Sequence, residues 1–203
     1  MKPNKPYVIG LTGGIACGKT HIAGALRDMQ VTVLDADAIS RSVTAPGGEA
    51  LPAVRAAFGD QVFDGEVLNR RALGDIVFRD ESARRTLEEI IHPLVIGKMQ
   101  RLTAQADTPI VAWDVPLLYE TGMDKQCDEV WCACVNENEQ IRRVMRRDKM
   151  TREQALLRIA SQLPLREKAA RSQHIISTEG TYRETRRRVR GLMRNLQRRL
   201  NLV

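Results

Sequence analysis

The sequence is poor in aromatic residues and in cysteines. Phe, Trp and Tyr make up 4% of the 203 residues, so platforms on which single-stranded bases could stack are scarce. The four cysteines form no Cys-x-x-Cys pair and the three histidines are widely spread, which excludes the usual zinc-ligand spacings. Three of the four cysteines lie in or just before an apolar, strand-like run, where a reduced thiol behaves as a small apolar side chain. We therefore expect a reducing compartment.

The sequence also lacks a long apolar segment. The short polar stretch 1–6 has no apolar core of a secretory signal, and no stretch approaches the roughly 20 apolar residues that cross a bilayer. With 43% apolar and 28% charged residues, the composition is that of an ordinary globular protein, and the length fits one compact domain with small inserted parts. We expect a soluble, cytoplasmic protein.

The formal net charge is +7, and much of the positive charge lies in residues 142–149 and 183–199. Such a balance occurs in nucleic-acid-binding proteins and in proteins whose pocket takes a polyanionic small molecule. No recognisable nucleic-acid motif is present, and the arginines of the tail alternate with an apolar stripe, as on a surface helix packed along one side. We expect small-molecule substrates, a solvated basic tail, and no nucleic-acid or membrane partner. The sequence leaves a monomer and a weak homo-oligomer open.

Five short apolar runs predict β-strands. Several of them are apolar at consecutive positions, as in strands that are covered on both faces of a parallel sheet. Helical patterns lie between them, which predicts an α/β layered fold. The predicted strands are 7–12, 31–34, 109–113, 129–135 and 174–177.

Three helices are predicted by periodicity and capping. One follows the glycine-rich segment after the first strand. The second spans about 151–163 and begins with a capping box of Thr151 and Gln154. The last begins at Thr181, whose capping-box partner is Glu184.

Residues 41–105 form a connection far longer than the usual α/β loop. Its pattern is largely helical, which predicts an inserted subdomain of the kind that often carries substrate specificity. Within it, His92 precedes Pro93, and we expect the proline to end the preceding helix. A lone histidine in such a place is more often structural than catalytic.

One segment matches the phosphate-binding pattern Gly-x-x-x-x-Gly-Lys-[Ser/Thr], with an apolar strand before it and an amphipathic helix after it. Its glycines allow successive N–H groups and the helix N-terminus to face phosphate. Lys19 would reach the β- and γ-phosphates and the Thr20 hydroxyl would bind Mg²⁺, so we predict ATP with Mg²⁺ as the co-substrate. A chance match in such a chain has a likelihood of roughly one in a hundred. The P-loop consists of Gly13, Gly14, Ile15, Ala16, Cys17, Gly18, Lys19 and Thr20.

Acidic residues follow two of the predicted strands. Asp35 and Asp37 close the second strand, and residues two apart on an extended chain point to the same side, so both carboxylates could face the γ-phosphate. One would accept or orient the proton of the acceptor hydroxyl while the other helps to hold Mg²⁺. The alternative for either residue is a helix N-cap. Asp114 directly follows the third strand, where a Walker B acid would hold Mg²⁺ through water, and a strand-ending turn residue is the alternative.

A dense basic cluster lies between the fourth strand and the second predicted helix. Its i,i+4 pairs share helix faces. Arginines on a lid supply cations over a transferring phosphoryl group, and the closing lid expels water. The alternative is a solvated basic face. The cluster consists of Arg142, Arg143, Arg146 and Arg147.

Taken in order, these motifs resemble the dephospho-CoA kinase family, which phosphorylates the ribose 3′-hydroxyl of dephospho-CoA with ATP in the last step of coenzyme A synthesis. The resemblance runs from Val8 to about Gly180. P-loop kinases for shikimate, gluconate or nucleoside monophosphates are the nearest alternatives, and the His-Pro and Pro-Leu-Leu-Tyr-Glu segments argue against them. The markers are Gly10–Ile15, Asp35–Asp37 with Arg41, Leu68–Arg70, Val77-Phe78, Leu87–Val95, Pro116–Glu120, Arg147-Asp148, and Arg158-Ile159 with Gln162.

The resemblance implies a P-loop kinase fold, in which helices flank a five-stranded parallel sheet, with a helical CoA-binding insertion and a helical lid. The implied nucleotide-binding core comprises residues 1–40, 106–136 and 170–203. The insertion would be 41–105 and the lid 137–169.

The resemblance also implies roles for individual residues. Asp37 matches the general base, and the other implied catalytic residues are Lys19, Asp35 and Arg147. ATP binding would extend beyond the P-loop to His21, Arg143 and Arg147. The residues implied for the acceptor are Thr12, Asp37, Arg41, Arg70, His92, Pro116 and Leu117. The residues implied for Mg²⁺ are Thr20 and, through water, Asp114.

The chain departs from the family pattern at two places. Ala16-Cys17 replaces the usual Gly-Ser, so Ala16 must adopt a backbone conformation that glycine reaches more easily. Ser172-Gln173 and Thr178 stand where Ala-Asp and Asn are common near the adenine, which leaves the adenine contacts open. From a different class, a nucleic-acid-binding NTPase regulator would show tight, strongly salt-dependent binding.

Overall fold

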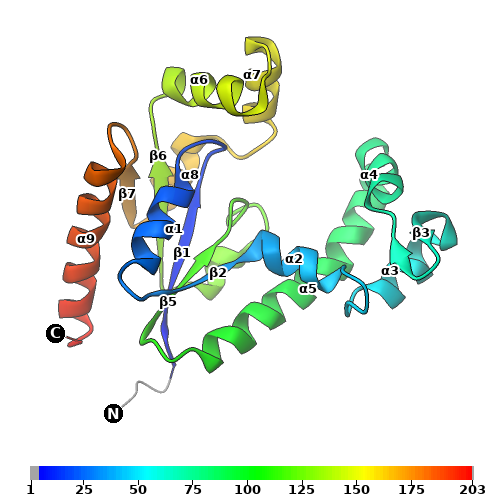
Figure 1. The fold of residues 1–203 in the computed structure, drawn as a ribbon, viewed down its shortest axis with the longest axis horizontal. Coiled ribbons are helices and arrows are strands. Elements are labelled where there is room, and N and C mark those ends of the chain that lie inside the picture. Colours follow the sequence, from blue (N-terminus) through cyan, green and yellow to red (C-terminus); the bar gives the residue numbers. More distant parts are fainter. Residues whose placement is uncertain (1–4, 203) are drawn as a thin grey trace. The chain divides into compact units, whose positions relative to one another are not determined.

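The protein was analysed as a computed structural model that describes residues 5–202. A five-stranded sheet in the order β2-β5-β1-β6-β7 forms its centre (Figure 1). β1 pairs in parallel with β5 and β6, and β6 pairs in parallel with β7. The strands are β1 (Tyr7–Gly13), β2 (Thr32–Asp35), β5 (Ile110–Asp114), β6 (Glu129–Cys134) and β7 (His174–Ser177). The predicted α/β fold is confirmed, and each predicted strand is shifted by at most one residue at either end.

The central strand β1 explains why consecutive apolar residues predicted a strand. Every residue of β1 after Tyr7 is buried, because helices cover both faces of the sheet. Ile9 lies between Ala112 of β5 and Glu129 of β6 in the parallel register. This register brings the carboxyl ends of β1, β5 and β6 together at one edge, where a ligand site of an α/β sheet lies.

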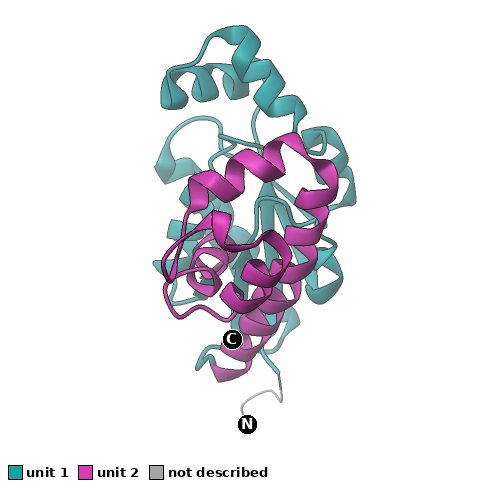
Figure 2. Cartoon of the chain, turned by 90° about the vertical axis from the view of Figure 1, so that its right-hand side faces the viewer, with its two compact units in different colours: residues 1–34, 106–203 teal, residues 35–105 magenta. Residues whose placement is uncertain are grey.

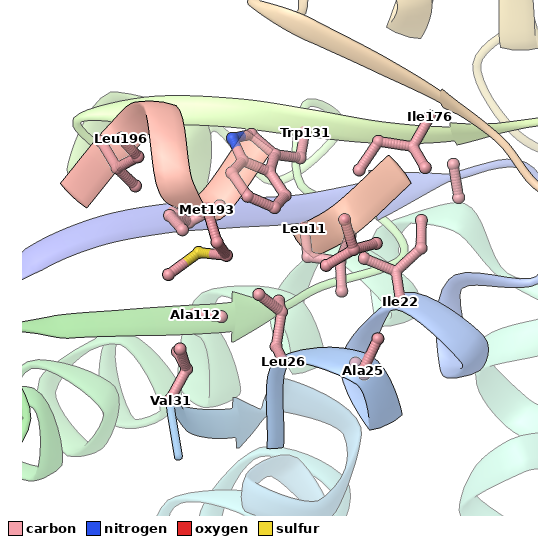
Figure 3. Close-up of a cluster of buried hydrophobic side chains, with 14 of the residues drawn as sticks. Leu11, Ile22, Ala25, Leu26, Val31, Ala112, Trp131, Ile176, Met193 and Leu196 are labelled. Atoms are coloured by element: carbon pink, nitrogen blue, oxygen red, sulfur yellow. The ribbon is translucent and has the colours of Figure 1, made fainter. Parts of the chain in front are cut away.

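Two helices cover one face of the sheet with the main apolar core (Figure 3). α1 (Lys19–Arg27) contributes Ile22 and Leu26, and α9 (Tyr182–Arg199) contributes Met193, all at most 2% exposed. These side chains pack on the β-strands around Trp131. Full burial of an aliphatic side chain stabilises a fold by about 1.5–3 kcal/mol, so this face supplies much of the stability of the sheet.

The opposite face of β1 is packed so closely that a side chain at Gly10 would force its neighbours to shift. A Cβ atom at Gly10 would lie 2.8 Å from both Cys127 Sγ and Leu118 Cδ2. α8 (Leu165–Arg171) packs on β1 and β6 and supplies the fully buried Lys168.

Two helices follow β6 and form the segment expected to be the lid. α6 (Glu137–Asp148) is capped by Asn136, and α7 (Arg152–Ala160) begins with the predicted capping box of Thr151 and Gln154. The capping box of α9, Thr181 with Glu184, is also confirmed. A 3-10 turn, η2 (Met123–Gln126), precedes β6.

The chain forms two compact units, residues 1–34 with 106–203 and residues 35–105 (Figure 2). The second unit begins six residues before the expected start of the insertion, and its first helix packs against its last. Its helices are α2 (Ala36–Val43), α3 (Leu51–Phe58), α4 (Arg70–Arg79) and α5 (Glu81–Gln105). Its remaining elements are the turn η1 (Asp60–Val62) and the antiparallel pair β3 (Phe63–Asp64) and β4 (Val67–Leu68).

The expectation that Pro93 ends a helix was wrong. Pro93 lies inside α5, which is continuous over 25 residues. A proline costs a helix one backbone hydrogen bond, but α2, α3 and α4 all pack along α5 and stabilise it as one piece.

Within residues 5–202, we find no helix with the length and apolar character that a membrane span requires.

Candidate active site

The P-loop joins the end of β1 to α1 with an unusual backbone. Ala16 has φ of 57° and Gly18 has φ of 77°, so the expected strained conformation of Ala16 is confirmed. At Gly18 a Cβ atom would also lie 2.8 Å from Thr178 Oγ1, so both the dihedral angle and the close approach require glycine. Left-handed residues in such a loop help to turn N–H groups to one side, which suits an anion.

The N-terminus of α1 is open toward the loop. Gly18 is its N-cap and provides no side-chain hydrogen bond, and no acidic residue lies in the first turn. The first N–H groups of the helix and the positive end of its dipole therefore remain available to phosphate. Lys19 and Thr20 occupy this first turn, as a P-loop requires.

Lys19 Nζ donates a hydrogen bond to Asp114 Oδ1, and the two side chains form an ion pair. Asp114 is the last residue of β5 and is 7% exposed. The carboxylate that follows the third predicted strand therefore reaches the P-loop, and a role as an ordinary turn residue does not explain this contact. Hydroxyl and carboxylate oxygens are ligands that suit Mg²⁺, so Thr20 and Asp114 fit the ion that an ATP-using family implies.

Thr178 and Arg143 fix the outer side of the loop. Thr178 Oγ1 donates to the carbonyl oxygen of Cys17 at 2.6 Å. Arg143 of α6 donates to Thr178 Oγ1 at 3.1 Å and to its carbonyl oxygen at 3.0 Å, while Glu139 accepts from Arg143 Nε at 2.6 Å. Arg143 is therefore linked to the P-loop through Thr178, and its predicted role in ATP binding stays a prediction.

Two glutamines of the lid segment hold the P-loop at Ile15. Gln140 Nε2 donates to the carbonyl oxygen of Ile15 at 3.0 Å, and Gln162 Oε1 accepts from its N–H at 3.0 Å. Both backbone groups of Ile15 are thus satisfied by side chains, as they would be by a neighbouring strand. Ile15 and Ala16 also pack on the small apolar cluster of α6 and α7.

The other arginines of α6 have no hydrogen bond to the P-loop among the described residues, and two of them pair with acidic residues of α6. Arg147 donates two hydrogen bonds to Asp148 and forms an ion pair with it. These hydrogen bonds are the main cause of both the raised pKa of Arg147 and the lowered pKa of Asp148. Arg142 pairs with Glu139, and Arg146 is exposed. The predicted role of Arg147 in ATP binding stays a prediction.

The loop after β5 is organised by a buried lysine. Lys168, fully buried, donates to the carbonyl oxygen of Pro116 at 2.8 Å and pairs with Glu120 at 2.7 Å. Thr12 Oγ1 donates to the same carbonyl oxygen at 3.1 Å. Leu117 is 41% exposed beside them. The Pro-Leu-Leu-Tyr-Glu marker is therefore a hydrogen-bonded turn directly beyond the strand that carries Asp114.

The same turn fixes the chain that returns from the lid. Glu120 Oε1 accepts from the N–H of Leu163 at 3.0 Å. Tyr119 hydrogen bonds to Ser172 at 2.8 Å, and the guanidinium of Arg171 lies 4.1 Å from the centre of its ring. Burial raises the pKa of Tyr119, so the phenol stays protonated and holds Ser172.

Two of the expected ATP-binding residues have structural contacts of their own. The ring of His21 packs edge-on against Tyr182, with 5.4 Å between the ring centres. Cys17 is 1% exposed, and burial raises the pKa of its thiol to about 11. Cys17 meets the loop through its backbone, whereas its side chain belongs to the apolar core.

The unusual residues near the adenine loop separate into two places. Ser172 and Gln173 precede β7, at the amino ends of the parallel strands, whereas the P-loop follows the carboxyl end of β1. Gln173 Oε1 accepts from the N–H of Val130 at 2.7 Å. Thr178 follows β7 and contacts the P-loop. Thr178 is therefore the departure that bears on the nucleotide site.

The two aspartates after β2 differ from the expected geometry. Asp35 is the N-cap of α2, and its Oδ1 accepts from the N–H of Ala38 at 2.9 Å. Asp37 lies in the first turn of that helix and is exposed. The expectation of an extended chain through both residues was wrong because α2 begins at Ala36, directly after the strand. The N-cap alternative is correct for Asp35.

The other residues implied for the acceptor lie in the second unit. Arg70 donates to the carbonyl oxygens of Arg41 at 3.1 Å and Thr44 at 3.2 Å, and so caps the C-terminal end of α2. The side chain of Arg41 is exposed, and His92 is partly buried within α5. Their roles toward an acceptor stay predictions.

Sequence reasoning did not assign a role to Gln140, Gln162 or Lys168. Gln162 appeared only as a family marker, and Thr178 only as a departure. Gln140 is 4% exposed, and its place three residues before the predicted site residue Arg143, on one face of α6, was the available signal in the sequence.

Comparison with known proteins identifies the family. A family model described as dephospho-CoA kinase matches residues 7–184. A dephospho-CoA kinase of Geobacter sulfurreducens is 41% identical over 187 residues, which cover 90% of this chain and 94% of the relative. One of Shouchella clausii is 42% identical over 185 residues, which cover 89% and 94%.

Solved structures agree with this result. TT1252 from Thermus thermophilus matches with a TM-score of 0.82 and 30% identity over 95% of this chain and 98% of that one. A dephospho-CoA kinase from Campylobacter jejuni has a TM-score of 0.71 at 22% identity, covering 94% and 97%, and shares the fold. The chain therefore belongs to the dephospho-CoA kinase family.

Proposed function

We propose that this protein transfers the γ-phosphoryl group of ATP to the ribose 3′-hydroxyl of dephospho-CoA and releases ADP and coenzyme A. The contact between Lys19 and Asp114 carries the proposal, together with the family. It joins the lysine that meets the β- and γ-phosphates to the acid that would hold Mg²⁺, and phosphoryl transfer depends on this positioned charge.

The nucleotide is bound by the P-loop. Its N–H groups and the N-terminus of α1 face the phosphates, and Lys19 neutralises charge that spreads onto the γ-phosphoryl oxygens. Thr20 and Asp114 would hold Mg²⁺, which would neutralise the negative charge that develops during phosphoryl transfer. Arg143 and Arg147 supply further cations from the lid.

In this proposal the acceptor is handled by Asp37 and six further residues. Asp37 orients the 3′-hydroxyl and accepts its proton, because its carboxylate is exposed and has no hydrogen-bond partner among the described residues. Asp35 supports it by capping the helix that carries it. The further acceptor residues are Thr12, Arg41, Arg70, His92, Pro116 and Leu117.

The proposal includes the arrangement and setting of the enzyme. The core would comprise residues 1–40, 106–136 and 170–203, the insertion 41–105 would bind CoA, and 137–169 would close as a lid. We propose that the enzyme acts in the cytoplasm with Mg²⁺-ATP.

The test is a product analysis. Purified protein with ATP and Mg²⁺ should convert dephospho-CoA into coenzyme A and ADP in equal amounts. The proposal is wrong if dephospho-CoA gives no turnover while shikimate, gluconate or a nucleoside monophosphate is phosphorylated.

A further inference from the structure

The positive charge of this protein is concentrated in one helix. α9 contains eight arginines, no lysine and a single acid, Glu184, which gives it a formal charge of +7. The chain as a whole also has a net charge of +7, so its 32 basic and 25 acidic residues leave 24 of each outside α9. The residues outside this helix therefore carry a formal net charge of zero.

The eight arginines fall into two groups. Three of them anchor the helix. Arg186 pairs with Asp28 at 3.3 Å, and Arg199 pairs with the buried Glu129. Arg188 donates to the carbonyl oxygens of Ser177, the last residue of β7, and Glu179. The other five are all exposed, and none forms an ion pair with a carboxylate in residues 5–202. These five, the α9 stripe, are Arg183, Arg187, Arg190, Arg194 and Arg198.

The α9 stripe is a straight row. With about 100° and 1.5 Å per residue, its spacing of four, three, four and four residues keeps the side chains within about 80° of the helix circumference over about 22 Å. Gly191 and Asn195 lie close to the row, and no acid follows Glu184 along the helix. A structural role does not explain this row, because the anchoring contacts are made by other arginines.

We propose that the α9 stripe binds the phosphate backbone of single-stranded nucleic acid without reading its bases. Arginine presents a planar fork that matches phosphate oxygens, and α9 uses arginine at every basic position. A stacked strand places a phosphate about every 3.4 Å, so a row of about 22 Å spans roughly six nucleotides.

The structure argues against two other polyanions. The apolar side of α9 is buried in the core through Val189, Met193 and Leu196, so the helix has no apolar face to insert into a membrane. The same burial prevents α9 from entering a duplex groove, and a strand that winds around a duplex leaves a straight row after a few phosphates. A flexible single strand can follow the whole row.

This inference differs from the expectation of no nucleic-acid partner. That expectation rested on missing motifs and scarce aromatic residues, which are the features that read or stack bases. A surface that contacts only phosphates needs neither, and Tyr182, 43% exposed at the start of α9, is the one aromatic residue of this helix.

The experiment measures binding of a fluorescent 15-nucleotide oligouridylate by anisotropy between 50 and 300 mM salt, because uridine stacks weakly and reports the backbone. The variant R187Q/R190Q/R194Q should bind at least tenfold more weakly at low salt. The slope of log K against log salt should fall in magnitude by about 2, since each phosphate contact of a single strand contributes about 0.7. Turnover with ATP and dephospho-CoA should not change, which also shows that the variant folds.

Two further variants provide controls. R79Q/R152Q/R166Q removes the same charge from exposed positions outside α9 and should bind within twofold of the wild type. R187K/R190K/R194K keeps the charge and should retain most of the salt slope with a several-fold lower affinity.

Three outcomes would overturn the proposal. The first is no binding by the wild-type protein at 50 mM salt. The second is equal loss in R187Q/R190Q/R194Q and in R79Q/R152Q/R166Q, which would assign the binding to net charge. The third is stripe-dependent binding to phosphatidylserine vesicles or to duplex DNA that exceeds binding to the oligouridylate.

Discussion

The two units of this protein hold their functional residues in different ways. In the first unit the P-loop is bonded on every side: Lys19 to Asp114, the Cys17 carbonyl to Thr178, and both backbone groups of Ile15 to glutamines. In the second unit, Asp37 and Arg41 have exposed side chains, and α5 buries only three of its 25 residues. The loop proposed to hold the phosphates is therefore preorganised, whereas we expect Asp37 and Arg41, if they contact the acceptor, to become ordered only when it binds.

Lys19→Ala tests the preorganised side and should have the largest effect. It removes the cation that meets the phosphates and leaves Asp114 without its ion-pair partner, so ATP binding and turnover should fall together. We expect kcat/KM to fall by about 10³-fold or more, measured by coupled ADP release, with nucleotide affinity from calorimetry. Lys125→Ala, at an exposed lysine, is the control. Unchanged ATP affinity would contradict the assignment.

Asp37→Asn tests the residues proposed for the acceptor. It should reduce turnover without weakening ATP binding. Turnover should drop by roughly 10²- to 10³-fold because the hydroxyl loses its base, while ATP affinity stays within about twofold. Single-turnover kinetics with calorimetry check both quantities. Wild-type turnover in this variant would rule out Asp37 as the base.

Gln140→Leu and Gln162→Leu test whether the loop is held by the lid glutamines. Each should raise KM for ATP about tenfold with a smaller change in kcat, because the loop loses its shape but keeps its cation. KM for dephospho-CoA should change little. The double variant should cost less than the sum of both, since the two bonds fix the same residue.

Gln105→Leu, at an exposed glutamine of the second unit, is the matched control for these variants. If Gln140→Leu and Gln162→Leu behave like Gln105→Leu, the bonds to Ile15 have no effect on nucleotide binding.

Alkaline pH should lower the free energy of unfolding through ionisation of Cys17, and this is the smallest of the expected effects. The pKa of its thiol is raised from 9.0 to about 11 by burial, so up to about pH 9 both the folded and the unfolded thiol are protonated. Between pH 9 and 11 the unfolded thiol ionises first, and stability falls as pH rises. In urea unfolding, the free energy of unfolding should fall between pH 9 and 10 in both proteins, and the fall should be about 1 kcal/mol smaller in Cys17→Ala than in the wild type.

The pKa values of Cys127 and Tyr7 are both raised to about 12. Their titration should therefore lower the free energy of unfolding at alkaline pH in both proteins. Parallel pH profiles for the wild type and Cys17→Ala would show that Cys17 titrates normally.

Local signals in the sequence predicted the strands, the capping boxes and the P-loop, because each depends on residues a few positions apart. Pro93 was misread because packing of three helices on α5 outweighs a local rule. Asp35 and Asp37 were placed on one extended face because a helix that begins directly at the end of a strand is marked locally only by its N-cap, and an aspartate there fits both interpretations. The bonds of Ile15 to Gln140 and Gln162 span 125 and 147 residues, beyond any periodicity or motif.

Because of the hydrogen bonds at Ile15, the eight-residue P-loop depends on residues outside itself for its conformation. Grafted into another kinase without side chains equivalent to Gln140 and Gln162, it would keep its consensus letters and lose the supports that set its path. Conversely, loop residues exchanged here must remain compatible with Gln140, because a Cβ atom at Gly14 would lie 2.6 Å from Gln140 Nε2. In this protein the path of the loop is set by its own residues together with two glutamines far along the chain.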